Sequence, residues 1–235
     1  MKKIIFGLIL FAIILSAGFF LLNIEVTTRQ GINYEVRTLK IPLYLKVLDF
    51  YDRHYNYKWL VNNLIKDKTG DEEKVMAIFK WTIENIARQP DELRTVDDHV
   101  WHIIVRRYGT HDQFSDVFTT LCNYAGIDAF FFRLFTKDKT SQIPFSLVKL
   151  HKRWCVFDPY NGTFFVNDKG DFASVEDIAK GDWGEKNFGN LKRPNLRYSD
   201  YFNEILSIDF ESAHKLSRAN IQSPINRLIY GVRKR

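Results

Sequence analysis

The sequence predicts an α+β domain, preceded by one uncharged N-terminal helix. Two observations predict this fold class: helical periodicity comes first along the chain, and short β-type segments with turn signals follow over residues 129–166. A third observation limits the protein class. Of 235 residues 46% are hydrophobic and 15% aromatic, so the chain can bury a large core, which excludes an intrinsically disordered protein.

Residues 4–24 carry no charge, and the run ends before Glu25. As a helix, its 21 residues extend about 31 Å, the hydrocarbon thickness of a bilayer. A cleaved signal peptide would have a shorter apolar stretch, and the small residues Ser16-Ala17-Gly18 are followed by four large apolar ones. We therefore expect residues 1–25 to be an uncleaved, single-pass membrane anchor.

Lys2 and Lys3 precede this run and predict the membrane topology. By the positive-inside rule they place the N-terminus in the cytoplasm and the rest of the chain across the membrane. The expected location is an inner or plasma membrane, with an extracytoplasmic domain that is periplasmic in a Gram-negative cell.

Three segments are expected after the anchor. Residues 26–70 are predicted as a juxtamembrane helical segment, in which Pro42 begins a helix that runs to about Lys66. The main domain is expected over residues 71–195, and a basic tail over residues 196–235.

The first helices of the domain follow from caps and apolar spacing. Asp71 is predicted to cap a helix that ends before Pro90, and Thr95 to open a second that stops at Gly109. The clearest amphipathic helix starts near Phe114, with apolar residues at i, i+3, i+4, i+7, i+8 and i+11, and ends at Gly126.

The spacing of apolar residues then changes to that of strands. Turn signals separate the segments, and Ser174 is expected to cap a short helix from Val175. The predicted strands are residues 129–135, 145–150, 154–157 and 163–166.

The chain has two cysteines, Cys122 and Cys155. An extracytoplasmic address would permit a disulfide between them. Cys122 falls on the apolar stripe of a helix and Cys155 in an apolar strand, so two buried free thiols are the preferred interpretation.

A motif begins at the start of the amphipathic helix. Residues 109–115 read GTHDQFS, Gly126-Ile127 closes the helix, and residues 154–159 read WCVFDP. Over residues 71–166 this pattern resembles the transglutaminase-like superfamily, which has the papain-like cysteine-protease fold. The family begins its helix with Gly, any residue and a nucleophilic Cys, carries a His two strands later, and then has a Trp followed by Asp-Pro.

The resemblance implies acyl transfer or amide hydrolysis, but two of the three catalytic positions differ. The nucleophile position falls on His111, the histidine position on Ile143, and only Asp158 matches. An imidazole cannot replace a thiolate as a durable acyl carrier, and Asp158 is expected to have no histidine to orient. We therefore predict a degenerate member, a pseudoenzyme with no intact catalytic residue and no cofactor.

Alternative sites remain open. A rebuilt Ser/His pair could use Ser115 or Ser146 with His151. A metal ion could be bound where His111, Asp112 and Asp158 converge, with His151 as a further ligand, but regular metal-ligand spacing is missing, so no metal site is predicted. Asp112, Gln113 and Trp183 are candidate binding residues, Trp183 because it is expected in an exposed loop.

The net charge of +6 is local, because residues 212–235 hold six basic residues and no acid. Nucleic acid is therefore not an expected partner. Ser223 and Pro224 begin a predicted helix with a face of Ile225, Leu228, Ile229 and Val232. It is expected to pack on its own domain, with anionic lipid or polysaccharide as the alternative contact.

The resemblance implies a binding or scaffold subunit, because membrane-tethered relatives accompany cell-envelope and surface-polysaccharide machinery. The expected partners are the membrane and another membrane or envelope protein. Two alternatives are an acyl-transfer or amide-hydrolysing enzyme with a relocated nucleophile, and a structural subunit that contacts its complex through the membrane helix.

Overall fold

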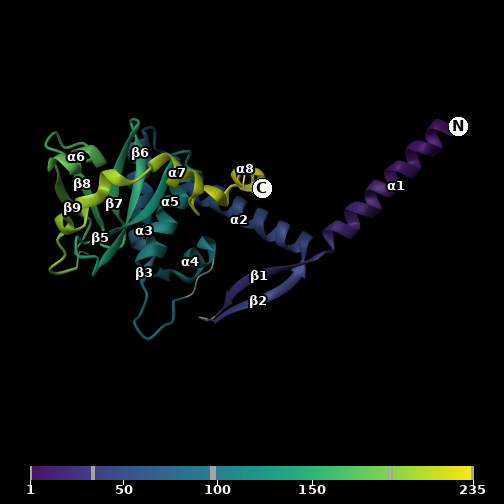
Figure 1. Ribbon diagram of the computed structural model, residues 1–235, viewed down its shortest axis with the longest axis horizontal. Helices are drawn as coiled ribbons and strands as arrows, with labels where there is room; N and C mark the ends of the chain where they lie inside the picture. Colours follow the sequence, from purple (N-terminus) through teal and green to yellow (C-terminus); the bar gives the residue numbers. More distant parts are fainter. Residues whose placement is uncertain (1, 33–34, 96–98, 190, 192, 234–235) are drawn as a thin grey trace. The chain divides into compact units, whose positions relative to one another are not determined.

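A computed structural model describes residues 2–32, 35–95, 99–189, 191 and 193–233 (Figure 1). The chain divides into two compact units, one formed by residues 1–53 and the other by residues 54–95 and 99–235. The family resemblance falls in the second unit.

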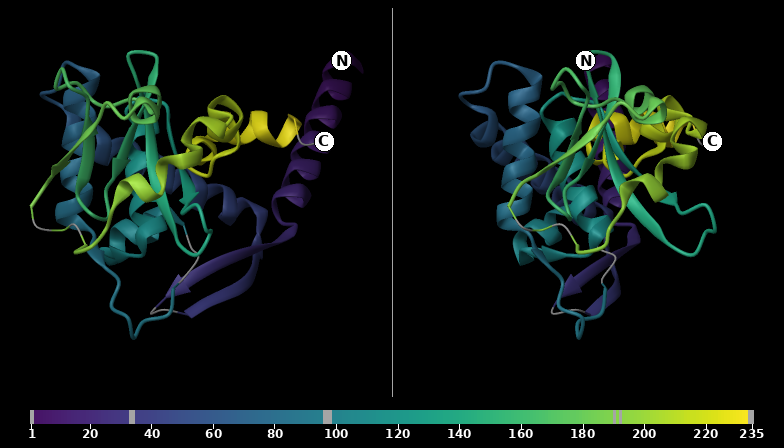
Figure 2. Two further views of the ribbon diagram at one scale, coloured as in Figure 1. Left: turned by 60° about the vertical axis from the view of Figure 1, so that its left-hand side comes forward. Right: turned by 90° about the vertical axis from the view of Figure 1, so that its left-hand side faces the viewer.

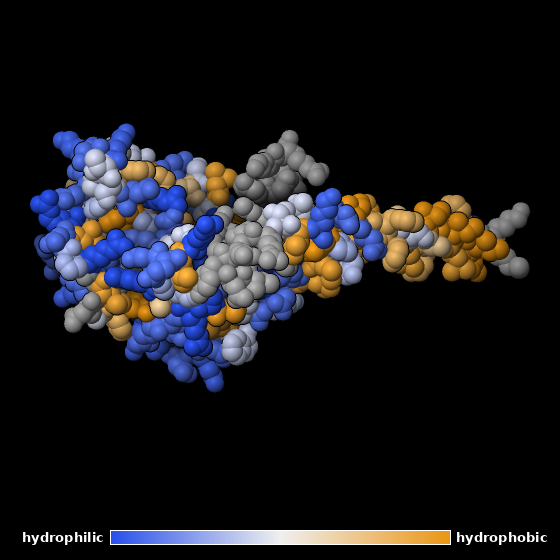
Figure 3. Space-filling model, turned by 90° about the horizontal axis from the view of Figure 1, so that it is seen from below, coloured by the Kyte–Doolittle hydropathy of each residue, from blue (hydrophilic) through white to orange (hydrophobic). Residues whose placement is uncertain are grey.

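The first unit begins with helix α1 (Lys2–Leu22), of which Lys3–Leu22 is long and apolar enough to cross a membrane. The face of this helix seen in Figure 3 is mostly hydrophobic. The most apolar stretch of this helix is not buried against any described part of the chain.

Strands β1 (Glu25–Ile32) and β2 (Glu35–Pro42) follow as an antiparallel hairpin in which Glu25 pairs with Pro42. The expectation of a helical segment over residues 26–70 is therefore wrong up to Pro42. The β-branched residues of both segments, Val26, Thr27 and Thr28 in one and Val36, Thr38 and Ile41 in the other, favour strands here. Helix α2 (Leu43–Ile65) then begins, as Pro42 predicted.

The second unit contains helices α3 (Asp71–Asn85), α4 (Val100–Arg106) and α5 (His111–Tyr124). Helix α5 ends as predicted, with Gly126 at a φ of 82°. The cap of α3 is Gly70 rather than Asp71, which lies in the first turn.

The predicted helix from Thr95 to Gly109 is confirmed over Val100–Arg106, and residues 96–98 of it lie outside the described residues. Helix α4 starts after His99, and Arg107 ends it by adopting a φ of 62°. The chain then forms strand β4 (Tyr108–Gly109), which pairs in parallel with β3 (Ala87–Arg88). This pairing straightens the chain just before α5.

A five-stranded sheet lies in the order β5-β6-β7-β8-β9, with every neighbouring pair antiparallel. The predicted strands are confirmed, as is helix α6 (Val175–Lys180) with its Ser174 cap. His151 and Lys152 make the turn between β6 and β7 with positive φ angles. The strands are β5 (Ala129–Phe135), β6 (Gln142–Leu150), β7 (Arg153–Asp158), β8 (Thr163–Val166) and β9 (Gly184–Asn187).

The sheet separates two apolar cores. Helices α3, α4 and α5 lie on one face of the sheet and the C-terminal segment lies on the other (Figures 1 and 2). Buried side chains form one core on each face. Tyr198, Phe202 and Ile205 of the C-terminal segment belong to the core on the second face. The elements of this C-terminal segment are η1 (Tyr198–Asp200), η2 (Phe202–Ser207), α7 (Phe210–Leu216), η3 (Asn220–Gln222) and α8 (Pro224–Arg233).

Both cysteines are free and buried, as predicted. Burial raises the pKa of the Cys122 thiol far above its ordinary value and raises the pKa of Cys155 to about 12. Both thiols are therefore poor nucleophiles.

Helix α8 is confirmed, but its expected packing on the domain is not found at Ile225 and Ile229, whose side chains are exposed. Of the basic residues before it, Arg218 forms an ion pair with the buried Asp116, at 3.3 Å.

Candidate functional site

The site is built where the start of α5 meets the end of β7. Gln113 fixes the helix start, because its Oε1 accepts a hydrogen bond from the backbone N–H of Thr110 at 3.0 Å and another from Arg106 at 2.9 Å. A Cβ at Gly109 would lie 2.9 Å from the Gln113 Cβ, so glycine is needed there. Gln113 is therefore a buried structural residue, whereas the sequence had suggested binding.

His111 is in the first turn of α5, and its Nε2 lies 2.9 Å from Oδ1 of Asp158. The prediction that Asp158 has no histidine to orient is therefore wrong. The orienting partner is the histidine at the nucleophile position, which enters from the helix and not from β6. The two residues are 47 positions apart, and only the fold brings them together.

Asp158 is fully buried, and donors surround its carboxylate. Oδ1 also accepts the Asn161 backbone N–H at 3.2 Å, while Oδ2 accepts Asn161 Nδ2 at 2.7 Å and the Tyr198 hydroxyl at 3.0 Å. Burial alone would raise the pKa of Asp158, but His111 and the Asn161 donors outweigh it and hold that pKa below its ordinary value. The carboxylate stays charged and its oxygens are occupied.

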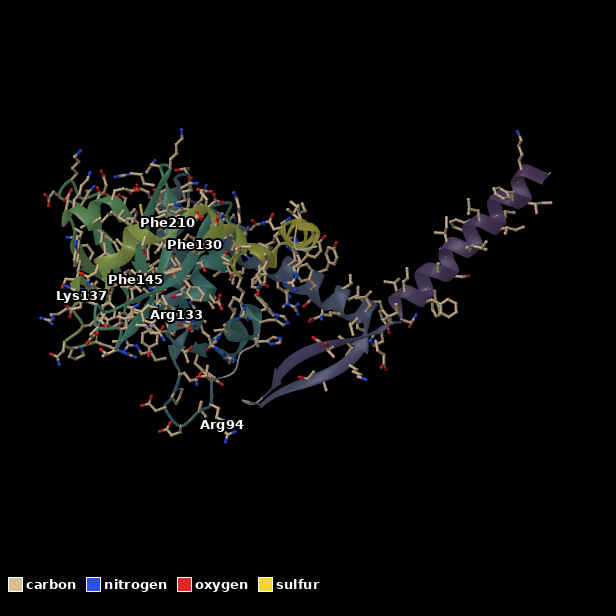
Figure 4. The ribbon with its side chains drawn as sticks, viewed as in Figure 1. Arg94, Phe130, Arg133, Lys137, Phe145 and Phe210 are labelled. Carbon is tan, nitrogen blue, oxygen red and sulfur yellow. The ribbon has the colours of Figure 1, made fainter. Side chains whose placement is uncertain are left out.

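Ile143, at the family's histidine position, lies in the apolar core on the outer face of the sheet. The C-terminal segment covers this face: rings of Tyr198 and Phe202 pack 5.8 and 5.1 Å from the ring of Phe145. Phe130, Phe145 and Phe210 are labelled in Figure 4; the first two are buried and Phe210 is partly buried against the same core. Burial and the adjacent Asp158 carboxylate raise the pKa of Tyr198, so its hydroxyl remains a donor.

The rim of the site is aromatic and positively charged. The His111 ring stacks on the Tyr160 ring with 4.5 Å between centroids and 18° between planes. Arg88 and Arg193 place their guanidinium carbons 4.5 and 5.1 Å from the same ring centroid. Arg88 also donates hydrogen bonds to the backbone carbonyls of Tyr160 and Leu191 and to Asn161 Oδ1. Among the described residues, neither arginine forms an ion pair with a carboxylate.

The rebuilt Ser/His pair is not assembled. The Oγ atoms of Ser115 and Ser146 are buried and have no hydrogen-bond partner among the described residues. His151 is exposed in the β6–β7 turn, with its Nε2 3.0 Å from Oε1 of Glu72. It lines a cavity of about 270 Å³ together with Cys155, Glu72, Leu150, Arg153, Asp171 and Phe172.

The remaining candidate residues have structural partners. Asp112 forms an ion pair with Arg133 of β5, which Figure 4 labels. Trp183 is not an exposed loop residue: it is half-buried and packs edge-on against Phe165 and Phe202, with centroids 5.6 and 5.1 Å apart. No group of three or more metal-ligating side chains occurs among the described residues.

Comparison with known proteins identifies the same region. Residues 58–159 match the model of the transglutaminase-like superfamily, a match that begins within α2, before the residues that carry the motif. No curated protein matches the chain.

Solved structures resemble it weakly. A candidate cysteine protease from Cytophaga hutchinsonii is 16% identical, with a TM-score of 0.41 over 57% of this chain and 46% of that one. A candidate protease from Parabacteroides distasonis is 15% identical, with a TM-score of 0.39 over 57% and 35%. A TGase is 13% identical, with a TM-score of 0.36 over 57% and 43%. The chain thus spans less than half the length of each.

Proposed function

From the premise that residues 58–159 form a transglutaminase-like domain, we propose that this chain is a catalytically inactive, membrane-anchored member of the superfamily that acts as a binding or scaffold subunit. The proposal has three parts: the chemistry that is lost, the anchor, and the surface that remains for a partner.

One observation carries the loss of chemistry: the nucleophile position holds His111, and this histidine is hydrogen-bonded to the buried Asp158. Thiol-based acyl transfer needs a thiolate beside a histidine. Both cysteines lie elsewhere with raised pKa values, and Asn161 and Tyr198 occupy the second oxygen of Asp158. The hydrogen bonds of Asp158 to His111 and Tyr198 then hold α5, β7 and η1 together.

The anchor supports a membrane location. Helix α1 is long and apolar enough to span a bilayer, and Lys2 and Lys3 favour a cytoplasmic N-terminus. The domain would then be extracytoplasmic, on the periplasmic side in a Gram-negative cell. Such a location fits a subunit of cell-envelope or surface-polysaccharide assembly.

The rim of the former active site is the best binding surface. The outer face of the sheet is filled by Tyr198 and Phe202, so a ligand cannot enter there. Arg88 and Arg193 on Tyr160 instead present positive charge without a carboxylate partner in the described part of the chain. Acidic groups on an envelope protein or polysaccharide match this charge.

Turnover measurements test the loss of catalysis. The full chain in detergent is assayed for dansylcadaverine incorporation into casein and for hydrolysis of p-nitrophenyl acetate, alongside His111→Ala and the surface control His151→Ala. We expect all three to match the protein-free rate. A turnover that His111→Ala abolishes in a folded protein, and that His151→Ala retains, would overturn the proposal in favour of a relocated nucleophile.

A second candidate function is that of a structural subunit whose partner contact is α1 itself. The full exposure of the apolar window of α1 favours it. Replacing residues 4–24 with an unrelated membrane anchor separates the two functions. If the domain carries the contact, the native complex survives the exchange; if α1 carries it, the complex disperses.

A further inference from the structure

The start of α2 carries an apolar surface that lies beside the end of the membrane helix. The backbone N–H of Leu43 donates to the carbonyl of Ile24 at 2.9 Å, and Glu25 pairs with Pro42 across the hairpin. The first strand of the hairpin therefore starts at the end of α1, and the second strand ends beside the same point. Helix α2 begins at the level where the apolar surface of α1 ends.

The exposed side chains on the first turns of α2 are largely apolar. Tyr44, Val47, Leu48 and Tyr51 fall within an arc of about 100° on the helix circumference, and Leu45 lies about 60° beyond it. All five are exposed, Leu48 at 60% of its surface. A stripe of this kind on a helix normally lies against another apolar surface.

The opposite side of the same turns is already occupied. Lys46 points away from the arc and its Nζ donates to the carbonyl of Thr27 in β1 at 2.7 Å. This hydrogen bond ties the side opposite the apolar arc to the hairpin, while the side chains of the arc itself are exposed. The exposed Ile24 continues the apolar surface of α1 toward this arc.

We propose that Tyr44, Leu45, Val47, Leu48 and Tyr51 form a second membrane contact, which inserts into the outer interface of the bilayer that α1 spans. This inference rests on the anchor in the proposed function. Tyr51 is eight residues beyond Leu43, about 12 Å along the axis. An oblique helix therefore keeps the whole patch within the headgroup and upper acyl region, where amphipathic helices insert and tyrosines are enriched.

Continuity with the anchor distinguishes the bilayer from other occupants. A backbone hydrogen bond fixes the start of the patch at the end of α1, so lipid around α1 also reaches the patch. Two contacts would restrain how the domain tilts above the membrane, whereas α1 alone would leave the domain free to rotate about one point.

A lipid-quenching experiment tests the inference on the full chain. Leu48→Cys is labelled with the fluorophore NBD and reconstituted into phosphatidylcholine–phosphatidylglycerol vesicles containing nitroxide-labelled lipid. Leu15→Cys reports on the anchor, and Asn62→Cys reports on an exposed polar position farther along α2. The native thiols are buried with raised pKa values and should not label, which the unsubstituted chain checks.

We expect lipid quenching at position 48 to be several-fold stronger than at position 62 and weaker than at position 15. Quenching at position 15 with none at position 48 would overturn the second contact and leave the anchor intact. Absence of quenching at both would overturn the anchor itself. A blue-shifted signal at position 48 without lipid quenching would show that a second copy or another protein covers the patch, which also contradicts the inference.

Discussion

Two histidine–carboxylate pairs lie at opposite ends of β7 and have nearly the same length. His111 Nε2 is 2.9 Å from Asp158 Oδ1, and His151 Nε2 is 3.0 Å from Glu72 Oε1. Their surroundings differ, since the side chains are 16% and 0% exposed in the first pair and 70% and 47% in the second. Water can hydrogen-bond to both side chains of the second pair, whereas the first pair is almost completely shielded from water.

The distance between two polar groups does not by itself determine how much their contact contributes to the free energy of unfolding. An exposed pair stabilises a protein by less than about 1 kcal/mol, because solvent screens the charges and two side chains must be ordered. Breaking a buried pair leaves a charged group without its partner, which is far more costly. The first pair should therefore hold the start of α5 to the end of β7, and the second should be dispensable.

The largest effect is expected for Asp158→Ala. It removes the acceptor for His111, Asn161 and Tyr198 together, and we expect the free energy of unfolding to fall by about 3–5 kcal/mol. Urea denaturation of the full chain in detergent measures it, with Glu72→Ala as the matched control. A loss at Asp158 no larger than at Glu72 would remove the distinction between the two pairs.

The pH dependence of unfolding sharpens the same contrast. The folded-state pKa of Asp158 is depressed, so its contribution is complete above its unfolded pKa of about 4 and is lost as the pH falls through the lower, folded value. The unfolding free energy should therefore decrease in this acid range for the native chain. Asp158→Asn should flatten the profile there, and an unchanged slope would contradict the assignment.

A smaller loss is expected for Tyr198→Phe, which removes one hydroxyl donor to the Asp158 carboxylate and keeps the packed ring. We expect destabilisation by about 1.5–2 kcal/mol. Tyr201→Phe is the control, since within the described residues its hydroxyl bonds only the neutral Ser141 hydroxyl, at 2.9 Å. Equal losses in the two variants would indicate that the charge on Asp158 adds nothing.

The smallest effect is expected for His151→Ala. Its ring is largely exposed and its partner Glu72 is solvated, so the unfolding free energy should change by less than about 0.5 kcal/mol. The same denaturation series measures it. A loss above 1 kcal/mol would mean that the turn at His151 has a structural role that its exposure does not suggest.

Sequence patterns predicted the elements that bury regular apolar faces. Phe114 to Gly126 and the strand at residues 154–157 were found because spacing of apolar residues and terminal glycines report directly on local structure. The β1–β2 hairpin was missed, because its β-branched residues are interspersed with polar and charged ones and its pairing reaches across 16 residues.

The residues of the candidate site were predicted, but their pairing was not. The sequence analysis assigned His111 and Asp158 to two separate positions of the family motif. It looked for the histidine partner of Asp158 on β6, whereas that partner is His111 at the start of α5. The link between them depends on how the start of α5 meets the end of β7. Local sequence does not encode such a contact. The hydrogen bond from Tyr198 to Asp158 was not predicted for the same reason.

A double-mutant cycle on His111 and Asp158 tests the central claim most directly. The unfolding free energies of the native chain, His111→Ala, Asp158→Ala and the double variant give the coupling between the two side chains. We predict a coupling of about 1.5–3 kcal/mol, against less than about 0.5 kcal/mol for the same cycle on His151 and Glu72. A coupling near zero at His111 and Asp158 would contradict the account, because this pair would then not hold the start of α5 to the end of β7.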